Sequence, residues 1–293
     1  MVFNCSKDTL FSSNLSLNLR GKLMDFTRPR VMGILNITPD SFYDGGRFMD
    51  QSCIIDHVRS MVNSGADIID VGGCSSRPGA RIPDAAEESE RVIPVLKLIR
   101  NECPDLPLSL DTFRANLADK AINDYKVDII NDISGGEMDP EMFDVVAKYQ
   151  VPYVLMHMKG TPATMQTQTS YENILQEMLG YFAHKMEQLR QKGLNDIIID
   201  PGFGFAKTLD QNYFLLKHLS AFRMLETPVM VGLSRKSMIY KYLDISPTEA
   251  LTGTIALNTI ALLQGTNILR VHDVKEAVET IALVHRTVQS REE

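Results

Sequence analysis

The stretch from Asp196 to Phe205 has residue types and a spacing that could form a binding site. Residues 196–199 are mostly β-branched and predict a short buried strand, which ends at the carboxylate Asp200. A buried carboxylate is costly unless a partner or ligand satisfies it. Pro201, Gly202 and Gly204 follow, and they let the backbone turn sharply and approach a ligand closely. Asp200 could instead cap the next helix.

Polar residues also end seven other apolar runs, which favours a ligand site over an isolated cap. The eight runs are 31–35, 67–71, 106–110, 127–130, 152–156, 196–199, 228–232 and 267–271. The residues that end them are Asn36, the turn 72–78, Asp111, Asn131 with Asp132, His157, Asp200, the turn 234–237, and Arg270 with His272. Asp132 and His157, taken alone, are explained equally well as caps or packing residues.

The chemistry of these residues falls into two groups. Asp111, Asn131 and Asp200 suit the N–H, NH2 and C=O edge of a flat heterocycle, because a carboxylate can accept two parallel N–H bonds. Arg270 and Asn36, with His272, instead suit an anion accompanied by a divalent ion, because a guanidinium fork fits phosphate oxygens and an amide oxygen is a hard ligand.

The loop 38–47, which follows Asn36, combines acids and an aromatic residue with Pro39 and the pair Gly45-Gly46. That composition predicts a lid that closes over the chemistry.

Helix-length segments separate the apolar runs. Helical patterns or start signals appear in 84–101, 114–124, 142–149, 171–192 and 248–264. Eight strand–helix units predict an α/β fold of the (β/α)8 TIM-barrel type, whose active site lies at the carboxyl ends of the strands. A doubly wound sheet is the alternative, but it does not require eight near-even units.

The N-terminal part of the chain has a different pattern. Residues 15–26 alternate apolar and polar around Arg20-Gly21-Lys22, which predicts a short β-hairpin that could plug one end of the barrel. Residues 1–14 have no period and are expected to be loose. No linker divides the rest, so we expect one domain over 15–289.

Composition excludes several classes of protein. A net charge of −7 and a pI near 5.4 argue against a nucleic-acid surface. No apolar run is long enough to span a membrane, and the N-terminus is too polar for a signal peptide. The four cysteines show no metal-like or disulfide spacing, so we expect a cytoplasmic protein.

Eight motifs occur in a specific order along residues 31–289. They are GILNITPDSFYDGG (33–46), DIIDVGGCSSRPGA (67–80), SLD (109–111), IINDISGG (129–136), VLMHMKGTPATMQ (154–166), DPGFGF (200–205), GLSRKSM (232–238) and RVHDV (270–274). Single motifs such as DPGFGF could occur by chance. All eight in this order resemble the dihydropteroate synthases of the pterin-binding enzyme family.

The resemblance implies a reaction, a fold and partners. The family, a sulfonamide target on a (β/α)8 barrel, condenses 6-hydroxymethyl-7,8-dihydropterin pyrophosphate with p-aminobenzoate. The products are 7,8-dihydropteroate, for folate biosynthesis, and pyrophosphate, and the reaction uses Mg²⁺. A homodimer is also implied. The small and apolar residues of 250–263 would permit its interface, but they are explained equally well as core packing.

Site residues are carried over by position. The expected pterin contacts are Asp111, Asn131, Met156, Asp200, Phe205, Gly232 and Lys236. Asn36, Arg270 and His272 match the pyrophosphate and Mg²⁺ side. Asn36 is the expected metal ligand, and Asp40 and Asp44 remain possible ones. Phe42, Asp44, Ser76, Arg77, Pro78, Lys236 and Ser237 match the p-aminobenzoate pocket. The expected catalytic residues are Asn36, Asp111, Lys236, Arg270 and His272.

Two residues depart from the family pattern. Cys74 stands where a glutamate is expected and removes a charge near the loop, whereas Ser76 replaces a threonine and keeps the hydroxyl.

We expect a dissociative, SN1-like displacement, since the cationic centre that the departing pyrophosphate leaves would conjugate with the electron-rich dihydropterin. No side chain stands out as a strong general base, and an aniline nitrogen, already unprotonated at neutral pH, does not need one first. Two alternatives stay open. A methyltetrahydrofolate–corrinoid methyltransferase would share the pterin slot, but it gives no reason for the anion group. A non-catalytic pterin-binding protein would be expected to lose Lys236 or the loop residues.

Overall fold

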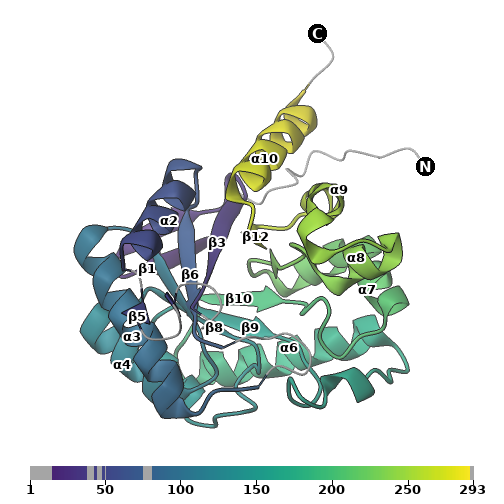
Figure 1. Cartoon of the computed structure of the whole chain (residues 1–293). Coiled ribbons are helices and arrows are strands. Elements are labelled where there is room, and N and C mark those ends of the chain that lie inside the picture. The colour runs from purple at the N-terminus through teal and green to yellow at the C-terminus, as the bar shows by residue number, and fades with distance from the viewer. Residues whose placement is uncertain (1–14, 38–42, 45–47, 50, 75–80, 291–293) are drawn as a thin grey trace.

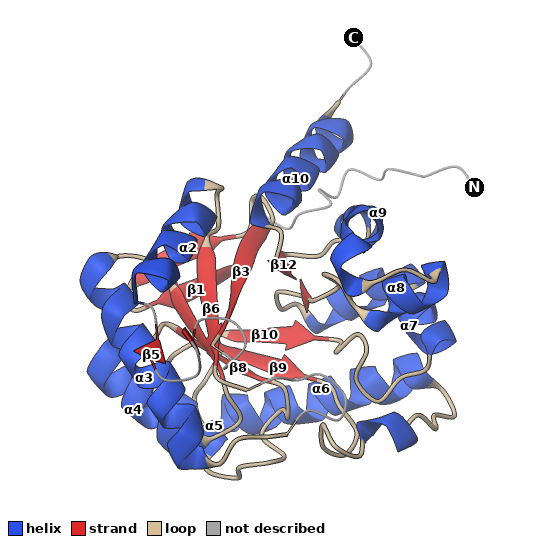
Figure 2. Ribbon diagram, in the orientation of Figure 1, coloured by secondary structure: helices blue, strands red, loops and turns tan. Residues whose placement is uncertain are grey.

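The computed structural model describes residues 15–37, 43–44, 48–49, 51–74 and 81–290. Parallel strands form its centre and helices surround them (Figures 1 and 2). The strands of the central sheet are β3 Arg30–Asn36, β6 Ile68–Gly72, β7 Leu108–Asp111, β8 Ile129–Asp132, β9 Tyr153–Met156, β10 Ile197–Asp200, β11 Met230–Val231 and β12 Ile268–Val271. They pair in the order β10-β9-β8-β7-β6-β3-β12-β11.

The two ends of this sheet meet beside β11. Ile199 of β10 forms a parallel bridge with Val229, and its N–H donates to the Pro228 carbonyl oxygen at 2.9 Å. The eight strands therefore close into a nearly complete barrel, which confirms the predicted fold and excludes the doubly wound sheet.

A helix follows each strand of the barrel. The α-helices in the described residues are α2 Gln51–Asn63, α3 Ala85–Glu102, α4 Ala115–Tyr125, α5 Met142–Tyr149, α6 Ile174–Gln191, α7 Leu209–Lys217, α8 Ser237–Leu243, α9 Leu251–Leu263 and α10 Val274–Gln289. Short 3-10 turns lie at η1 Met165–Thr167, η2 Leu219–Leu225 and η3 Pro247–Glu249. No described helix has both the length and the apolar character of a membrane span.

Some helix starts follow from local sequence. The Asp84 carboxylate caps α3 by accepting from the Glu87 N–H at 2.9 Å. The predicted helix 248–264 begins later, at Leu251, because Ser246 and Glu249 form a capping box around the 3-10 turn η3. The apolar residues of α6 recur at helical spacing and predict one buried stripe. Five of them are buried, namely Ile174, Met178, Phe182, Met186 and Leu189, while Leu175 and Tyr181 are partly buried.

Strand alternation creates two cores. Outward-facing strand residues pack against the helices in the larger cluster. Inward-facing residues form an apolar layer near the amino ends of the strands, and its members are Met32, Ile68, Ile129, Val154, Ile198, Met230 and Ile268. Burial of each such side chain contributes about 1.5–3 kcal/mol.

The predicted N-terminal hairpin covers this inner layer. Strands β1 Ser16–Leu19 and β2 Lys22–Asp25 pair antiparallel. Leu17, Leu19 and Phe26 are buried in the same cluster as the inward-facing residues of the barrel. The hairpin is therefore the barrel's plug, as the sequence predicted.

The loop predicted to act as a lid is described only in part. Strand β4 Tyr43–Asp44 lies within it and pairs antiparallel with β5 Phe48–Met49, which directly follows the loop. Phe42 and Asp40 lie outside the described residues.

Candidate active site

A polar layer lies directly above the apolar layer inside the barrel. Each of its members is two residues further along its strand than a member of the apolar layer, so it faces the same way. These residues are Asp70, Asn131, Met156, Asp200, Gly232 and Arg270. Residues from five strands, together with Gly232 directly after β11, thus converge without any special loop geometry.

One cavity opens at this layer. Its lining combines acceptors, cations and apolar side chains from β8, β9, β10, β12 and the turns that follow β8, β10 and β11. The residues are Asn131, Ile133, Met156, Asp200, Gly202, Phe203, Phe205, Gly232, Lys236 and Arg270. Six of the seven predicted pterin contacts line it, and the seventh, Asp111, bonds to Arg270.

Arg270 connects the two predicted halves of the site. Its Nε donates to Asp70 Oδ2 at 2.7 Å, and its Nη2 donates to Asp111 Oδ2 at 2.7 Å. Burial raises the pKa of Asp111 to about 7, and the positive charge of Arg270 opposes that rise. The pterin group and the anion group are therefore adjacent at one rim, because the side chains of Asp111 and Arg270 are in contact.

Asp200 ends β10 and is 7 % exposed. Its Oδ1 accepts the Gly202 N–H at 2.8 Å, while helix α7 is capped by Thr208, so Asp200 is no helix cap. Burial raises the pKa of this carboxyl, while the Gly202 N–H and then Lys236 counteract it. Its remaining acceptor capacity is available to a ligand in the cavity.

The turn after Asp200 runs very close to the end of β9. Gly202 has a φ of +67°, and a Cβ there would lie 2.3 Å from the His157 carbonyl oxygen. Only glycine fits at this position, because the turn approaches the backbone of β9. The close approach of this turn to a ligand stays a prediction.

Lys236 reaches the cavity from the turn between β11 and α8. Its Nζ lies 4.3 Å from the centroid of the Phe205 ring. Burial lowers the pKa of this ammonium to about 8, and Asp200 opposes the change. Lys236 precedes α8, whose first residue is Ser237.

The turn that carries Lys236 is tied to the end of β12. Arg235 has a φ of +55° and forms a bidentate pair with Asp273, with Nε–Oδ2 at 3.0 Å and Nη2–Oδ1 at 2.7 Å. His272 Nδ1 lies 3.2 Å from the Ser234 hydroxyl oxygen. Partial burial, and then the charge of Arg270, lowers the pKa of His272.

Of the remaining predicted residues, the structure places Asn36, and it places Asp44 by its backbone only. Asn36 ends β3 beside Gly72 of β6, and a Cβ at Gly72 would lie 3.3 Å from the Asp111 Cβ. Asp44 belongs to β4, but its side chain is not described. Phe42, Ser76, Arg77 and Pro78 lie outside the described residues.

Cys74, one of the two departures from the family pattern, lies near the buried carboxylate of Glu88. Cys74 is half-buried, and burial and then the nearby Glu88 carboxylate raise the pKa of its thiol. Glu88 itself is fully buried and binds Arg114 Nε at 2.7 Å. A glutamate at position 74 would bring a second carboxylate toward this buried acid.

Two of the strand-end residues have structural roles. The Asp132 carboxylate accepts from the backbone N–H groups of Ser134 and Gly136 and from the Tyr153 hydroxyl, at 2.7–3.0 Å. His157 is buried with its ring edge-on to Tyr181. These are the packing and turn roles that the sequence left open for both.

Several lining or supporting residues were not predicted. Asp70, Ile133, Phe203 and Lys207 belong to this set. Asp70 carried a signal, since it is an acid inside the apolar run Ile68–Gly72 and two residues from a turn. The burial of Lys207 had no signal, because a lysine after DPGFGF has the pattern of an exposed helix start.

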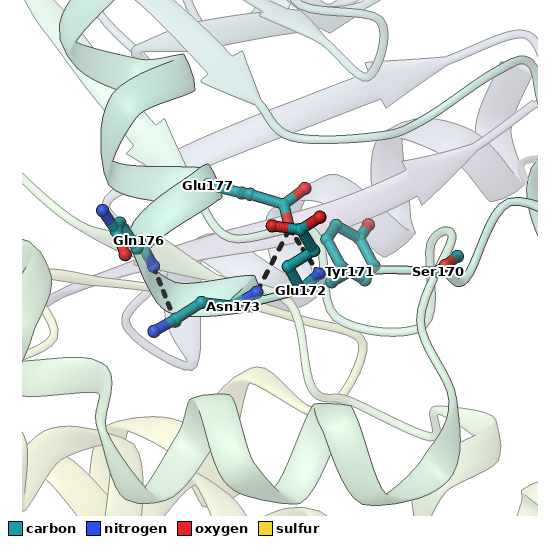
Figure 3. Close-up of a pocket in the computed structure, with 6 residues that line it drawn as sticks. All are labelled: Ser170, Tyr171, Glu172, Asn173, Gln176 and Glu177. Carbon is teal, nitrogen blue, oxygen red and sulfur yellow. Dashed lines mark hydrogen bonds between the residues drawn. The ribbon is translucent and has the colours of Figure 1, made fainter.

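A second, larger hollow lies on the surface at the start of α6 (Figure 3). The Glu177 carboxylate accepts from the N–H groups of Glu172 and Asn173, at 2.8 and 3.3 Å, while Asn173 Oδ1 accepts from Gln176 N at 3.1 Å (Figure 3). These polar groups therefore satisfy the helix N-terminus. None of its lining residues lines the strand-end cavity.

Comparison with known proteins agrees with this arrangement. The sequence profile of the family described as "Pterin binding enzyme" matches residues 32–272. Dihydropteroate synthase of Escherichia coli K12 is 41 % identical over 280 residues, which cover 95 % of this chain and 98 % of the relative. The enzyme of Synechocystis is 45 % identical, covering 88 % and 89 %. The chain belongs to the dihydropteroate synthase family.

Solved structures of dihydropteroate synthases share the fold. The Yersinia pestis enzyme in complex with a sulfonamide drug has a TM-score of 0.87 and 39 % identity, covering 94 % of this chain and 100 % of that one. The Xanthomonas albilineans enzyme with 4-aminobenzoic acid has a TM-score of 0.86 and 35 % identity, covering 94 % and 99 %. The dihydropteroate synthase family comprises pterin-binding transferases of folate biosynthesis, and this chain is one of them.

Proposed function

We propose that the protein condenses 6-hydroxymethyl-7,8-dihydropterin pyrophosphate with p-aminobenzoate, giving 7,8-dihydropteroate and pyrophosphate. The observation that carries this proposal is a single cavity in which Asp200 and Asn131 meet Lys236 and Arg270. The acceptors that a heterocycle needs and the cations that an anion needs thus line the same cavity.

The pterin would bind as a flat ring with its amino edge toward the acids. Asp200 accepts N–H donors from that edge, and Asn131 adds an amide group. Met156, Ile133 and Phe205 supply apolar surface, and they belong to one buried cluster above the barrel. Lys236, over the Phe205 ring, is placed to donate to the ring system.

The diphosphate would lie toward the cationic side. Arg270 and Lys236 supply positive charge, and His272 adds a ring N–H beside Ser234. Ser237 begins α8 next to Lys236, so we assign it with Ser76, Arg77, Pro78, Phe42 and Asp44 to the p-aminobenzoate side, as the family pattern implies.

A bound Mg²⁺ fits this site only as part of a complex with the substrate. The described residues contain no group of three or more His, Cys, Asp or Glu side chains that could hold a metal. Mg²⁺ often keeps several waters and binds through one protein oxygen plus substrate phosphates. We assign that protein oxygen to Asn36, and the ion would neutralise charge on the departing pyrophosphate.

Bond breaking would precede bond formation. The C–O bond at the pterin methylene breaks, and its electron pair leaves with pyrophosphate, whose charge Arg270 and Lys236 stabilise. The resulting cation conjugates with the dihydropterin, whose far edge faces Asp200 and Asn131. The unprotonated amine of p-aminobenzoate then attacks the methylene carbon and loses a proton to water.

Turnover with purified protein tests this function. We expect pyrophosphate release that requires both p-aminobenzoate and Mg²⁺. Release without p-aminobenzoate would indicate hydrolysis, and no release with both would support a non-catalytic binder. Methyl transfer from methyltetrahydrofolate to a corrinoid would instead identify the alternative enzyme.

Secondary kinetic isotope effects at the methylene then test the dissociative step, and values typical of tight associative displacement would contradict it.

We also propose a homodimer through α9. Ala256, Ile260 and Leu263 form an exposed apolar stripe on this helix, and Ile260 and Leu263 are each 41 % exposed. Ala261 and Leu262 of the same helix pack in the core, whereas the stripe faces away from it and is available to a partner. A location in the cytosol stays a prediction from the sequence.

A further inference from the structure

Asp70 is, with Asp200, one of two carboxylates in the polar layer, and the family pattern gave it no role. It lies in the middle of β6 and is 0 % exposed. Its neighbours Ile69 and Val71 pack outward against the helices, whereas Ile68 packs in the inner layer. Asp70 therefore faces the barrel interior, one step above that layer.

One oxygen of Asp70 serves two cavity residues at once. Oδ2 accepts from Arg270 Nε at 2.7 Å and from Asn131 Nδ2 at 3.0 Å. Oδ1 is buried and has no hydrogen-bond partner among the described residues. A buried carboxylate whose bonded oxygen reaches only two cavity-lining side chains is well placed to orient both of them.

The contact with Asn131 decides which end of its amide faces the ligand. A carboxylate without a proton only accepts hydrogen bonds, so the atom of Asn131 that faces Asp70 must be the NH2 group. The carbonyl oxygen of Asn131 is then directed away from Asp70. Without Asp70, the amide could turn over and present a donor in place of an acceptor.

The contact with Arg270 fixes the plane of the guanidinium. Asp70 accepts from Nε and Asp111 accepts from Nη2, so carboxylates from the neighbouring strands β6 and β7 bind one edge of the guanidinium. Nη1 is then the nitrogen that remains for an anion. Loss of Asp70 would leave the guanidinium attached at one nitrogen only and free to rotate.

We propose that Asp70 is a positioning residue for the reaction: it holds Asn131 as an acceptor for the pterin and Arg270 as a fixed donor to the diphosphate. This inference rests on the proposed function. It predicts that the neutral isostere at position 70 damages catalysis far more than it damages folding.

The test compares Asp70→Asn with Asp132→Asn. Asp132 is a matched control, because it is also a fully buried carboxylate. It lies on the face of β8 opposite to Asn131, and its hydrogen bonds go to the turn after β8 and to Tyr153. We expect Asp70→Asn to lower kcat/KM about 100-fold. Asp132→Asn is expected to lower the melting temperature while kcat/KM stays within about threefold, measured where both variants are folded.

A double-mutant cycle separates positioning from general destabilisation. Calorimetry would measure the Kd of free pterin for Asp70→Asn, Asn131→Ala and the double variant. We expect Asp70→Asn alone to weaken pterin at least tenfold, and to have less than a threefold effect once Asn131 is alanine. Equal losses in both backgrounds, or a kcat/KM within threefold of wild type for Asp70→Asn, would overturn the proposal.

The wild-type assay keeps this test distinct from that of the function. If wild type binds pterin without forming dihydropteroate, the proposed reaction fails while the pterin cycle still decides the role of Asp70. If wild type turns over and the cycle is additive, the function stands and the positioning role fails.

Discussion

Asp200 shows how a single side chain can set ligand preference. One of its oxygens is committed to the Gly202 N–H, so its other acceptor positions face the cavity. Because the residue is buried, every N–H donor that a ligand brings is desolvated and must be matched.

Asp200→Asn is expected to weaken pterin binding by about 2–4 kcal/mol, because part of an acceptor pair becomes a donor that meets the N–H groups of the ligand. Calorimetry with free pterin measures the change. The fold should persist, since the amide oxygen can still accept from Gly202. Unchanged pterin affinity would remove Asp200 from the pterin site.

Arg270→Ala is expected to weaken the diphosphate substrate more strongly than free pterin, because only the former brings an anion. Free pterin should also lose affinity, since the buried Asp111 would lose its ion pair and Asp70 would keep only the Asn131 amide as a donor. Removal of the cation from these buried carboxylates should cost about 3–5 kcal/mol of stability. Calorimetry with each ligand and denaturation with urea measure both effects. Equal weakening of the two ligands would contradict a role at the diphosphate.

At the scale of elements, the turn after β10 depends on a buried lysine. Lys207 Nζ donates to the carbonyl oxygens of Gly202 and Phe205 at 3.0 and 2.9 Å, and it lies 3.3 Å from His157 Nδ1. Burial lowers the pKa of this ammonium to about 7, and the negative Asp200 opposes the change. Lys207 thus joins the end of β9 to the turn that presents Asp200 and Phe205.

His157 gives this junction a pH dependence. Burial, and then the positive Lys207, lower its pKa to about 2, well below its ordinary value. As pH falls below about 6.5, the unfolded chain binds a proton at His157 that the folded protein does not bind. Stability from this residue is therefore complete above that pH and is lost progressively on acidification.

His157→Gln removes the titration and keeps an acceptor for Lys207. Between pH 7 and pH 5, wild type should lose about 2 kcal/mol more free energy of unfolding than the variant, from about 1.36 kcal/mol per pH unit below pH 6.5. Urea denaturation at both pH values measures the difference. Parallel losses in the two proteins would show that His157 is protonated in the folded state.

At the scale of the whole molecule, the residues of the inner apolar layer and those of the candidate site lie at opposite ends of the barrel. The hairpin β1–β2 and the apolar layer fill the end at the amino ends of the strands, while the polar layer and cavity lie toward the carboxyl ends. Helices α7, α8 and α9 lie together on one side of the barrel (Figure 1), and the exposed stripe of α9 lies away from the core.

Ile260→Glu tests the proposed dimer at this scale. The side chain is 41 % exposed, so the folded monomer should tolerate a glutamate, but a dimer would have to bury its charge. We expect dimer affinity to fall at least about tenfold, or about 1.4 kcal/mol, by sedimentation. Leu23→Glu, on the exposed face of the hairpin, is the matched control and should leave the association unchanged.

The sequence by itself determined the strand and helix periods, the hairpin plug, the rim of polar residues and the glycine turn after Asp200. These follow from local rules, because side-chain alternation and backbone conformation depend on a few neighbouring residues. Among the residues expected at the pterin, Asn131 and Asp200 could be found in this way, whereas Met156 and Phe205 came only from the family resemblance.

Only the tertiary structure decided which polar residues touch. Asp70 and Arg270 are 200 positions apart and meet because β6 and β12 lie on either side of β3 in the closed sheet. Asp132 and Asn131 are adjacent in sequence, yet alternation sends one outward to a turn and the other into the cavity. Contacts between distant strands depend on register and closure of the whole barrel, which no local pattern encodes.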